Sequence, residues 1–167
     1  MQKIIITLIN VLLLFSCGNK KSDVTTQNNQ TEVFNVNPNK SKKIESIDFE
    51  RTTCYGTCPA FRLSIYKNDS AVFKGLKYTK FIGNAKQKLP ENTFYKLESQ
   101  IIDMNIKELQ DNYSIDATDN ATAILVINFD DGTRKRIIDY GLSGTPKLKK
   151  LYTELTKIGT TTNWKAR

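Results

Sequence analysis

Apolar residues occupy every second position in two runs of the chain, over residues 47–49 and 61–65. This is the period of a β-strand with one buried face, and the intervening C-Y-G-T-C-P carries the glycine and proline of a turn. The two runs therefore predict a β-hairpin. A further turn and then Gly75 predict a third strand around residues 72–73 and a fourth over residues 78–82.

The period changes to that of an amphipathic helix after residue 89. Pro90 is placed to open one helix, whose apolar residues fall on one stripe. A second helix is predicted from Thr145 as N-cap, followed by Pro146, to Gly159 as C-cap. The first stripe consists of Phe94, Leu97, Ile101 and Met104, and the second of Leu148, Leu151, Tyr152, Leu155 and Ile158.

Two more strands lie between the predicted helices. Residues 121–129 are apolar on both faces, which favours a central strand, and Asp131-Gly132 predicts a hairpin turn into residues 134–140. Strands outnumber helices and are mostly joined by hairpins. We therefore expect residues 44–167 to form one α+β domain, a mostly antiparallel sheet of about six strands with two α-helices packed on one face.

The N-terminus has the pattern of an export signal. Lys3 precedes an apolar run over residues 4–15, which as a helix would rise about 18 Å and cannot span a hydrocarbon core of about 30 Å. The run ends in L-F-S-C, which resembles a lipobox. The resemblance implies that residues 1–16 are a lipoprotein signal peptide and that Cys17 becomes the lipidated first residue.

The next segment, over residues 17–43, is dominated by Asn, Gln, Lys, Ser and Thr without helical or strand period. We expect a disordered tether that gives the domain reach from a membrane. Stable anchoring takes two or more acyl chains, which a lipidated Cys17 would carry. Gly18 is not an acidic retention signal, so by analogy with bacterial sorting the outer membrane is favoured, with the domain periplasmic or surface-exposed.

The charge balance is basic, at +8 for the whole chain, and loss of Lys3 with the signal leaves 24 − 17 = +7. A basic surface favours anionic partners, or is simply a solvated face. Nucleic acid is not expected, because the chain is exported and shows no nucleic-acid motif. Membrane headgroups, glycans or an envelope protein are the partners that the sequence favours.

Cys54 and Cys58 are the cysteines that remain once Cys17 is lipidated, and disulfides persist in exported proteins. A structural disulfide is the favoured interpretation. A redox pair is the alternative, although the spacing is C-x-x-x-C and not C-x-x-C. A zinc site would be half empty, since the chain has no histidine, so neither metal nor cofactor is expected.

The residues around these cysteines carry a family resemblance. They read R-T-x-C-Y-G-x-C-P-x-F-x-L-x-I from Arg51 to Ile65, with Asn112-Tyr113, Thr118-Asp119 and Asp139-Tyr140 downstream. This pattern resembles a family of bacterial exported proteins known only as a domain of unknown function. The resemblance extends from about Ile44 to Trp164, and it implies a fold but no activity.

The absence of histidine also removes the usual general base and the Ser-His and Cys-His nucleophile pairs. Asp116 and Asp119 are expected to serve a turn. We therefore expect a non-enzymatic binding or envelope-structural module, with a thiol-disulfide redox or other enzymatic accessory as the alternative. A possible polar groove near the cysteine turn comprises Arg51, Tyr55, Tyr113, Asp119, Asp139 and Tyr140.

Overall fold

A computed structural model describes residues 42–166 of the chain. The predicted signal peptide, Cys17 and nearly all of the tether lie outside these residues. The described elements are β1 Ile44–Arg51, β2 Ala60–Tyr66, β3 Ser70–Lys77, β4 Gly83–Lys88, α1 Thr93–Asp103, the 3₁₀ turn η1 Ile106–Glu108, β5 Asn112–Tyr113, β6 Thr122–Phe129, β7 Arg134–Tyr140 and α2 Pro146–Thr161. No helix between residues 42 and 166 is long and apolar enough to cross a membrane.

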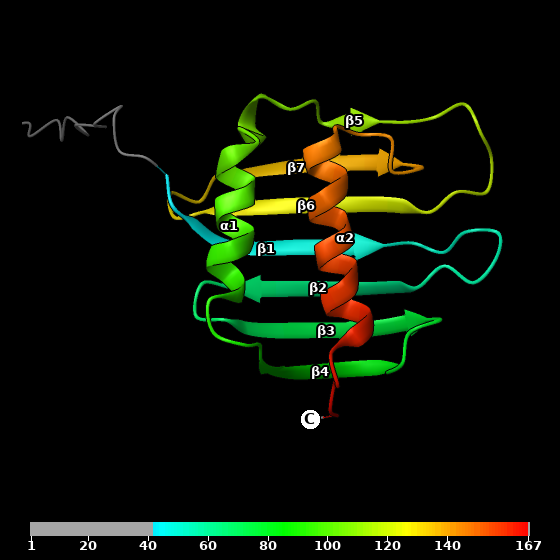
Figure 1. The fold of residues 1–167 in the computed structure, drawn as a ribbon, viewed down its shortest axis with the longest axis horizontal. Helices are drawn as coiled ribbons and strands as arrows, with labels where there is room; N and C mark the ends of the chain where they lie inside the picture. Colours follow the sequence, from blue (N-terminus) through cyan, green and yellow to red (C-terminus); the bar gives the residue numbers. More distant parts are fainter. Residues whose placement is uncertain (1–41, 167) are drawn as a thin grey trace, which may run out of the picture. The chain divides into compact units, whose positions relative to one another are not determined.

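The strands form one sheet in the order β4-β3-β2-β1-β6-β7-β5. All neighbours are antiparallel except β5 and β7, which run parallel. Both long helices cross the same face of the sheet (Figure 1). The predicted α+β class is confirmed, but the sheet has seven strands, because the two-residue β5 pairs with the edge of β7 after a stretch without strand period.

The fourth strand is not where the sequence predicted it. Residues 78–82 form the turn, with Tyr78 in the left-handed region at φ 54°, and β4 starts at Gly83. Gly75, predicted as a turn, lies inside β3. A Cβ atom there would collide with the carbonyl oxygen of Phe81, so the glycine lets the turn fold back over its own strand.

The first helix begins at Thr93 and not at Pro90. Its leading N–H groups are satisfied from a distant turn, because the Asp69 carboxylate accepts from the backbone N–H of Asn92 at 3.0 Å and of Phe94 at 2.7 Å. A carboxylate at a helix N-terminus also interacts favourably with the positive end of the helix dipole. The cap was invisible in the sequence because it lies more than twenty residues before the helix.

The second helix begins as predicted. Thr145 is the N-cap and its Oγ accepts from the N–H of Leu148 at 3.3 Å. The predicted end is wrong, because the helix continues past Gly159 to Thr161. A Cβ atom on Gly159 would come within 2.5 Å of the Phe61 ring, so this glycine serves close packing of α2 on the sheet and not a cap.

An aromatic row runs through the core between the helices and the sheet. Tyr152 of α2 stacks on Phe49 with ring centroids 5.6 Å apart, and Phe61 and Phe73 continue the row across β2 and β3. Trp164 closes it, stacked on Phe73 at 4.5 Å, with its indole N–H donating to the carbonyl of Gly159 at 3.0 Å. Through this row, the segment that follows α2 packs against the strands.

Candidate functional site

The six residues of the predicted groove gather at one end of the sheet. Arg51 ends β1, Asp139 and Tyr140 end β7, Tyr113 lies on β5, and Tyr55 and Asp119 lie on loops beyond β1 and before β6. These two loops touch, because the backbone N–H of Tyr55 donates to the carbonyl of Asp119 at 3.0 Å. The antiparallel pairing of β1 with β6 and of β6 with β7 explains this gathering, since β1 and β7 both end where β6 begins.

Several of the six are engaged in holding loops. Tyr55 is 88% exposed at the tip of the cysteine loop, and Asp119 is exposed with φ 64°. The Tyr140 hydroxyl accepts from the backbone N–H of Asn120, and the Tyr113 hydroxyl accepts from that of Gln110, both at 3.2 Å. Arg51 is the one of the six that lines the cavity described below.

Asp139 organises the loop between β7 and α2. Its side chain is fully buried, at 0% exposure, and its carboxylate accepts from the backbone N–H of Ser143 at 2.7 Å and of Gly144 at 2.9 Å. The Ser143 hydroxyl lies at 3.2 Å from the same carboxylate. A Cβ atom on Gly144 would come within 2.7 Å of the carboxylate, so this approach requires a glycine. Asp139 therefore fixes the shape of the loop between β7 and α2 and does not itself line the cavity.

Leu142 occupies a strained position within that loop. Its φ of 54° lies in the left-handed region, which costs a leucine roughly 1–2 kcal/mol. The preceding Gly141, at φ 75°, needs no such strain. Strained residues of this kind cluster at functional sites. Here the strained loop carries the Leu142 side chain to the wall of a cavity beside α2.

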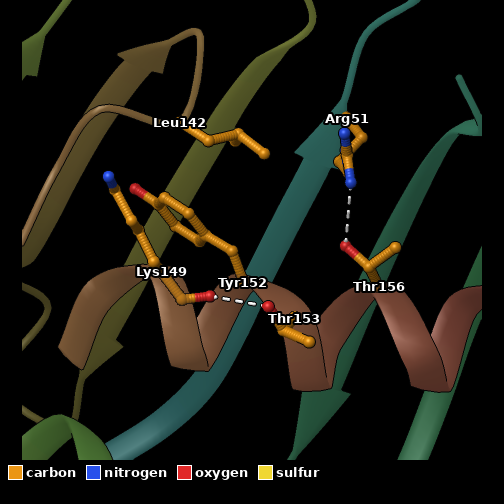
Figure 2. A pocket seen from close by; sticks show the side chains of 6 residues that line it. All are labelled: Arg51, Leu142, Lys149, Tyr152, Thr153 and Thr156. Carbon is orange, nitrogen blue, oxygen red and sulfur yellow. Dashed lines mark hydrogen bonds between the residues drawn. The ribbon is translucent and has the colours of Figure 1, made fainter. Parts of the chain in front are cut away.

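The cavity has a volume of about 260 Å³. It lies between the end of β1, the loop before α2 and the middle of α2, as Figure 2 shows. Its lining consists of Arg51, Leu142, Lys149, Tyr152, Thr153 and Thr156. Of these, sequence reasoning selected Arg51 for a site and assigned Tyr152 to the core.

Arg51 is the central polar group of the cavity. Its Nη1 donates to the Thr156 hydroxyl at 3.4 Å, a long hydrogen bond visible in Figure 2, and its Nε is buried without a hydrogen-bond partner in the described residues. Arg51 forms no ion pair with any carboxylate between residues 42 and 166. Burial lowers the pKa of Arg51 below its ordinary value, yet a guanidinium stays charged in proteins. The cavity therefore contains an unneutralised positive charge.

Tyr152 adds a second unused polar group. The residue is 2% exposed, and its buried hydroxyl has no hydrogen-bond partner among the described residues. Burial, and then the nearby Asp139 and Tyr113, raise the pKa of Tyr152 well above its ordinary value. The side chain is therefore a neutral phenol with an O–H to donate. Lys149 supplies an exposed ammonium beside it, and the Thr153 hydroxyl donates to the carbonyl of Lys149 at 2.9 Å.

A weak signal for this site was present in the sequence. Lys149, Thr153 and Thr156 recur at helical spacing directly beside the apolar stripe of α2, so they share one face of the helix. A polar stripe of this kind is typical of a solvated helix surface. Only the position of β1 and of the Leu142 loop converts it into a cavity wall.

The cysteine loop lies at the same end of the sheet. Cys54 and Cys58 form a disulfide with Cα atoms 5.6 Å apart, which confirms the predicted bond. It closes a short loop after β1, directly beyond Arg51. Between residues 42 and 166, no three metal-type ligands come together. The disulfide thus braces the segment that follows the cavity's arginine.

Comparison with known protein families finds a match over the segment that forms the sheet and the helices. The sequence profile of the family described as Domain of unknown function (DUF6438) matches residues 45–159, from the start of β1 to the last turns of α2. A search of curated proteins finds no match. The match covers more than half of the chain and includes every residue that lines the cavity, and of the described strands and helices it leaves out only the first residue of β1 and the last two of α2. The chain therefore belongs to the DUF6438 family of domains of unknown function.

Proposed function

We propose that this chain is a bacterial lipoprotein, anchored in the cell envelope through acyl chains on Cys17, whose domain is a non-enzymatic binding module. The short apolar run ending in L-F-S-C supports the anchor, and the outer membrane is the favoured location. The R-T-x-C-Y-G-x-C-P motif, by its resemblance to bacterial exported proteins, supports the same origin. The tether gives the domain reach from the membrane.

The α2 cavity is the observation that carries the binding role. Its buried Arg51 Nε and Tyr152 hydroxyl have no hydrogen-bond partner among residues 42–166. A buried polar group without a hydrogen bond costs about 1–3 kcal/mol, so a protein that keeps two of them in one cavity wall gains when a ligand supplies the missing partners. The lining contains no carboxylate, thiol or imidazole, which favours capture of a ligand over acid-base or nucleophilic chemistry.

The anchor is tested by fractionation of cells that express the Cys17→Ser variant. Wild-type protein should stay with membranes through a high-salt wash, while the variant should become fully extractable, because it has no acyl chain. Lys20→Ser provides a matched control that keeps Cys17. A Cys17→Ser protein that still resists the wash would overturn the lipoprotein assignment.

The binding role is tested by blocking the cavity. Thr153→Trp places a large side chain on an exposed position of the wall, and Lys157→Trp places the same side chain on an exposed position of α2 outside it. Native mass spectrometry of the mature protein, released gently from its membranes, should find a small bound molecule on wild type and on Lys157→Trp but not on Thr153→Trp. Equal occupancy in all three, or none in wild type, would contradict a ligand in this cavity.

A further inference from the structure

We propose that the α2 cavity binds the carboxylate group of a small organic anion with a short apolar body. This rests on the proposed binding function and names the chemical class of its ligand. The first argument is charge. Arg51 and Lys149 line the cavity, and no acidic residue does.

Two acidic residues close in sequence to the cavity lining make hydrogen bonds elsewhere. Asp139 accepts hydrogen bonds from Ser143 and Gly144 in the loop before α2. Glu154, on another side of α2, accepts from the Gln100 amide at 2.6 Å. The charge of Arg51 is therefore not neutralised by the folded domain. An anion in the cavity would neutralise it in a partly desolvated place, where a charged hydrogen bond is stronger than in water.

The donor geometry favours a carboxylate over phosphate. A guanidinium is a planar fork that pairs with the two oxygens of a carboxylate and equally with a phosphate, and the Nε of Arg51 has no partner among the described residues. The surrounding backbone therefore decides between the two anions. Phosphate sites in proteins commonly add backbone N–H groups at a helix N-terminus or in a nest. The floor here is the middle of α2, residues 149–156, where backbone N–H groups are used within the helix.

The remaining lining sets the size and polarity of the ligand. Leu142, the ring of Tyr152 and the aliphatic stem of Lys149 offer apolar surface next to the cation. The volume of about 260 Å³ is below the range of roughly 300–1,000 Å³ that is usual for drug-sized ligands. The neutral Tyr152 phenol can donate to an anion once a ligand displaces the side chains that cover its hydroxyl. A short aliphatic acid fits these limits.

The test uses the mature lipidated chain in an uncharged detergent, with 4,4,4-trifluorobutyrate as the probe. Ligand-observed ¹⁹F NMR reports its saturable binding, and 4,4,4-trifluorobutanamide is the neutral probe of the same shape. We expect millimolar binding of the acid and at least about tenfold weaker binding of the amide, because the amide lacks the charge that pairs with Arg51. Inorganic phosphate should displace the acid only at higher concentration.

Variants assign the binding to the cavity. Arg51→Gln should weaken binding of the acid at least about tenfold, and Arg51→Lys should weaken it less, because the charge remains while the planar fork is lost. Tyr152→Phe should weaken it a few-fold. Arg62→Gln is the matched control, since that guanidinium is paired with Glu50 on the other face of the sheet. If the Arg51 variants do not fold, Lys149→Gln and Thr153→Trp replace them.

The results separate the carboxylate class of the ligand from the binding function of the cavity. Equal binding of amide and acid, or tighter binding of phosphate, overturns the carboxylate class and leaves the cavity as a binding site for another ligand. An effect of Arg62→Gln equal to that of Arg51→Gln overturns the site by showing unspecific charge attraction. Saturable binding of none of the three probes overturns the carboxylate class, whereas ligand loss on Thr153→Trp would still uphold the binding function.

Discussion

The core beneath α2 and the end of the sheet beside Arg51 are built on opposite principles. In the core, Phe49, Leu151 and Leu155 are almost fully buried, and aromatic rings meet edge-on or stacked. At the sheet end, a carboxylate is buried among backbone N–H groups, a leucine is strained, and a guanidinium forms no ion pair within the described part of the chain. The first arrangement maximises stability. The second leaves buried polar groups without partners among the described residues, which the proposed binding function would use.

The two regions also differ in their contribution to the free energy of folding. Each buried polar group without a partner at the sheet end costs about 1–3 kcal/mol, and a leucine in the left-handed region costs roughly 1–2 kcal/mol. A fully buried leucine in the core contributes a similar or larger amount with the opposite sign. The stability of the well-packed core can therefore offset the cost of the strained leucine and the unpaired polar groups at the sheet end.

The largest effect is expected in the core. Leu151→Ala combined with Leu155→Ala should abolish cooperative thermal unfolding. Truncating one buried leucine to alanine costs about 2–5 kcal/mol, and the free energy of unfolding of a whole domain is about 5–15 kcal/mol. Circular dichroism during heating measures it. Lys150→Ala, an exposed change directly before Leu151, should melt like the parent. A double variant with a parental midpoint would show that α2 is not the main cover of the core.

A smaller effect is expected at the loop that Asp139 holds. Asp139→Asn keeps the size of the side chain but turns an acceptor into a donor facing backbone N–H groups, so urea unfolding should show a loss of about 2–3 kcal/mol. The exposed Asp116→Asn should stay within about 0.5 kcal/mol of wild type. Equal stability of the two variants would mean that the Asp139 carboxylate does not hold the loop. The sheet end would then not differ from the core in the way described above.

The smallest effect is expected from the disulfide. Replacing both Cys54 and Cys58 by Ala should cost about 2 kcal/mol in urea unfolding, because the closed loop is short and its removal frees little chain entropy. The disulfide should matter more for the position of Arg51 than for stability, so probe binding should fall while the fold persists. Ready reduction of the bond in the folded protein, together with a function that depends on its redox state, would favour the redox alternative.

The sequence by itself determined the features that depend on neighbouring residues. The strand period, the stripe of Leu148 to Leu155 and the Thr145 cap act within a few residues, so they predicted the α+β class and the start of α2. The bond between Cys54 and Cys58 was predicted because these two cysteines remain besides Cys17 and stand four residues apart. The same local reasoning failed where a distant group intervened. Pro90 did not open α1 because Asp69 caps it, and Gly159 did not end α2 because Phe61 packs against it.

Tertiary structure alone decided the candidate site. The Arg51 side chain meets Thr156 across 105 residues of sequence, and Leu142 reaches the cavity through a loop fixed by a buried carboxylate. No period in the chain encodes such a meeting, because it follows from the order of strands in the sheet and from which face α2 covers. Core residues are marked by the regular spacing that burial imposes, whereas the residues of a cavity share only a place in the fold.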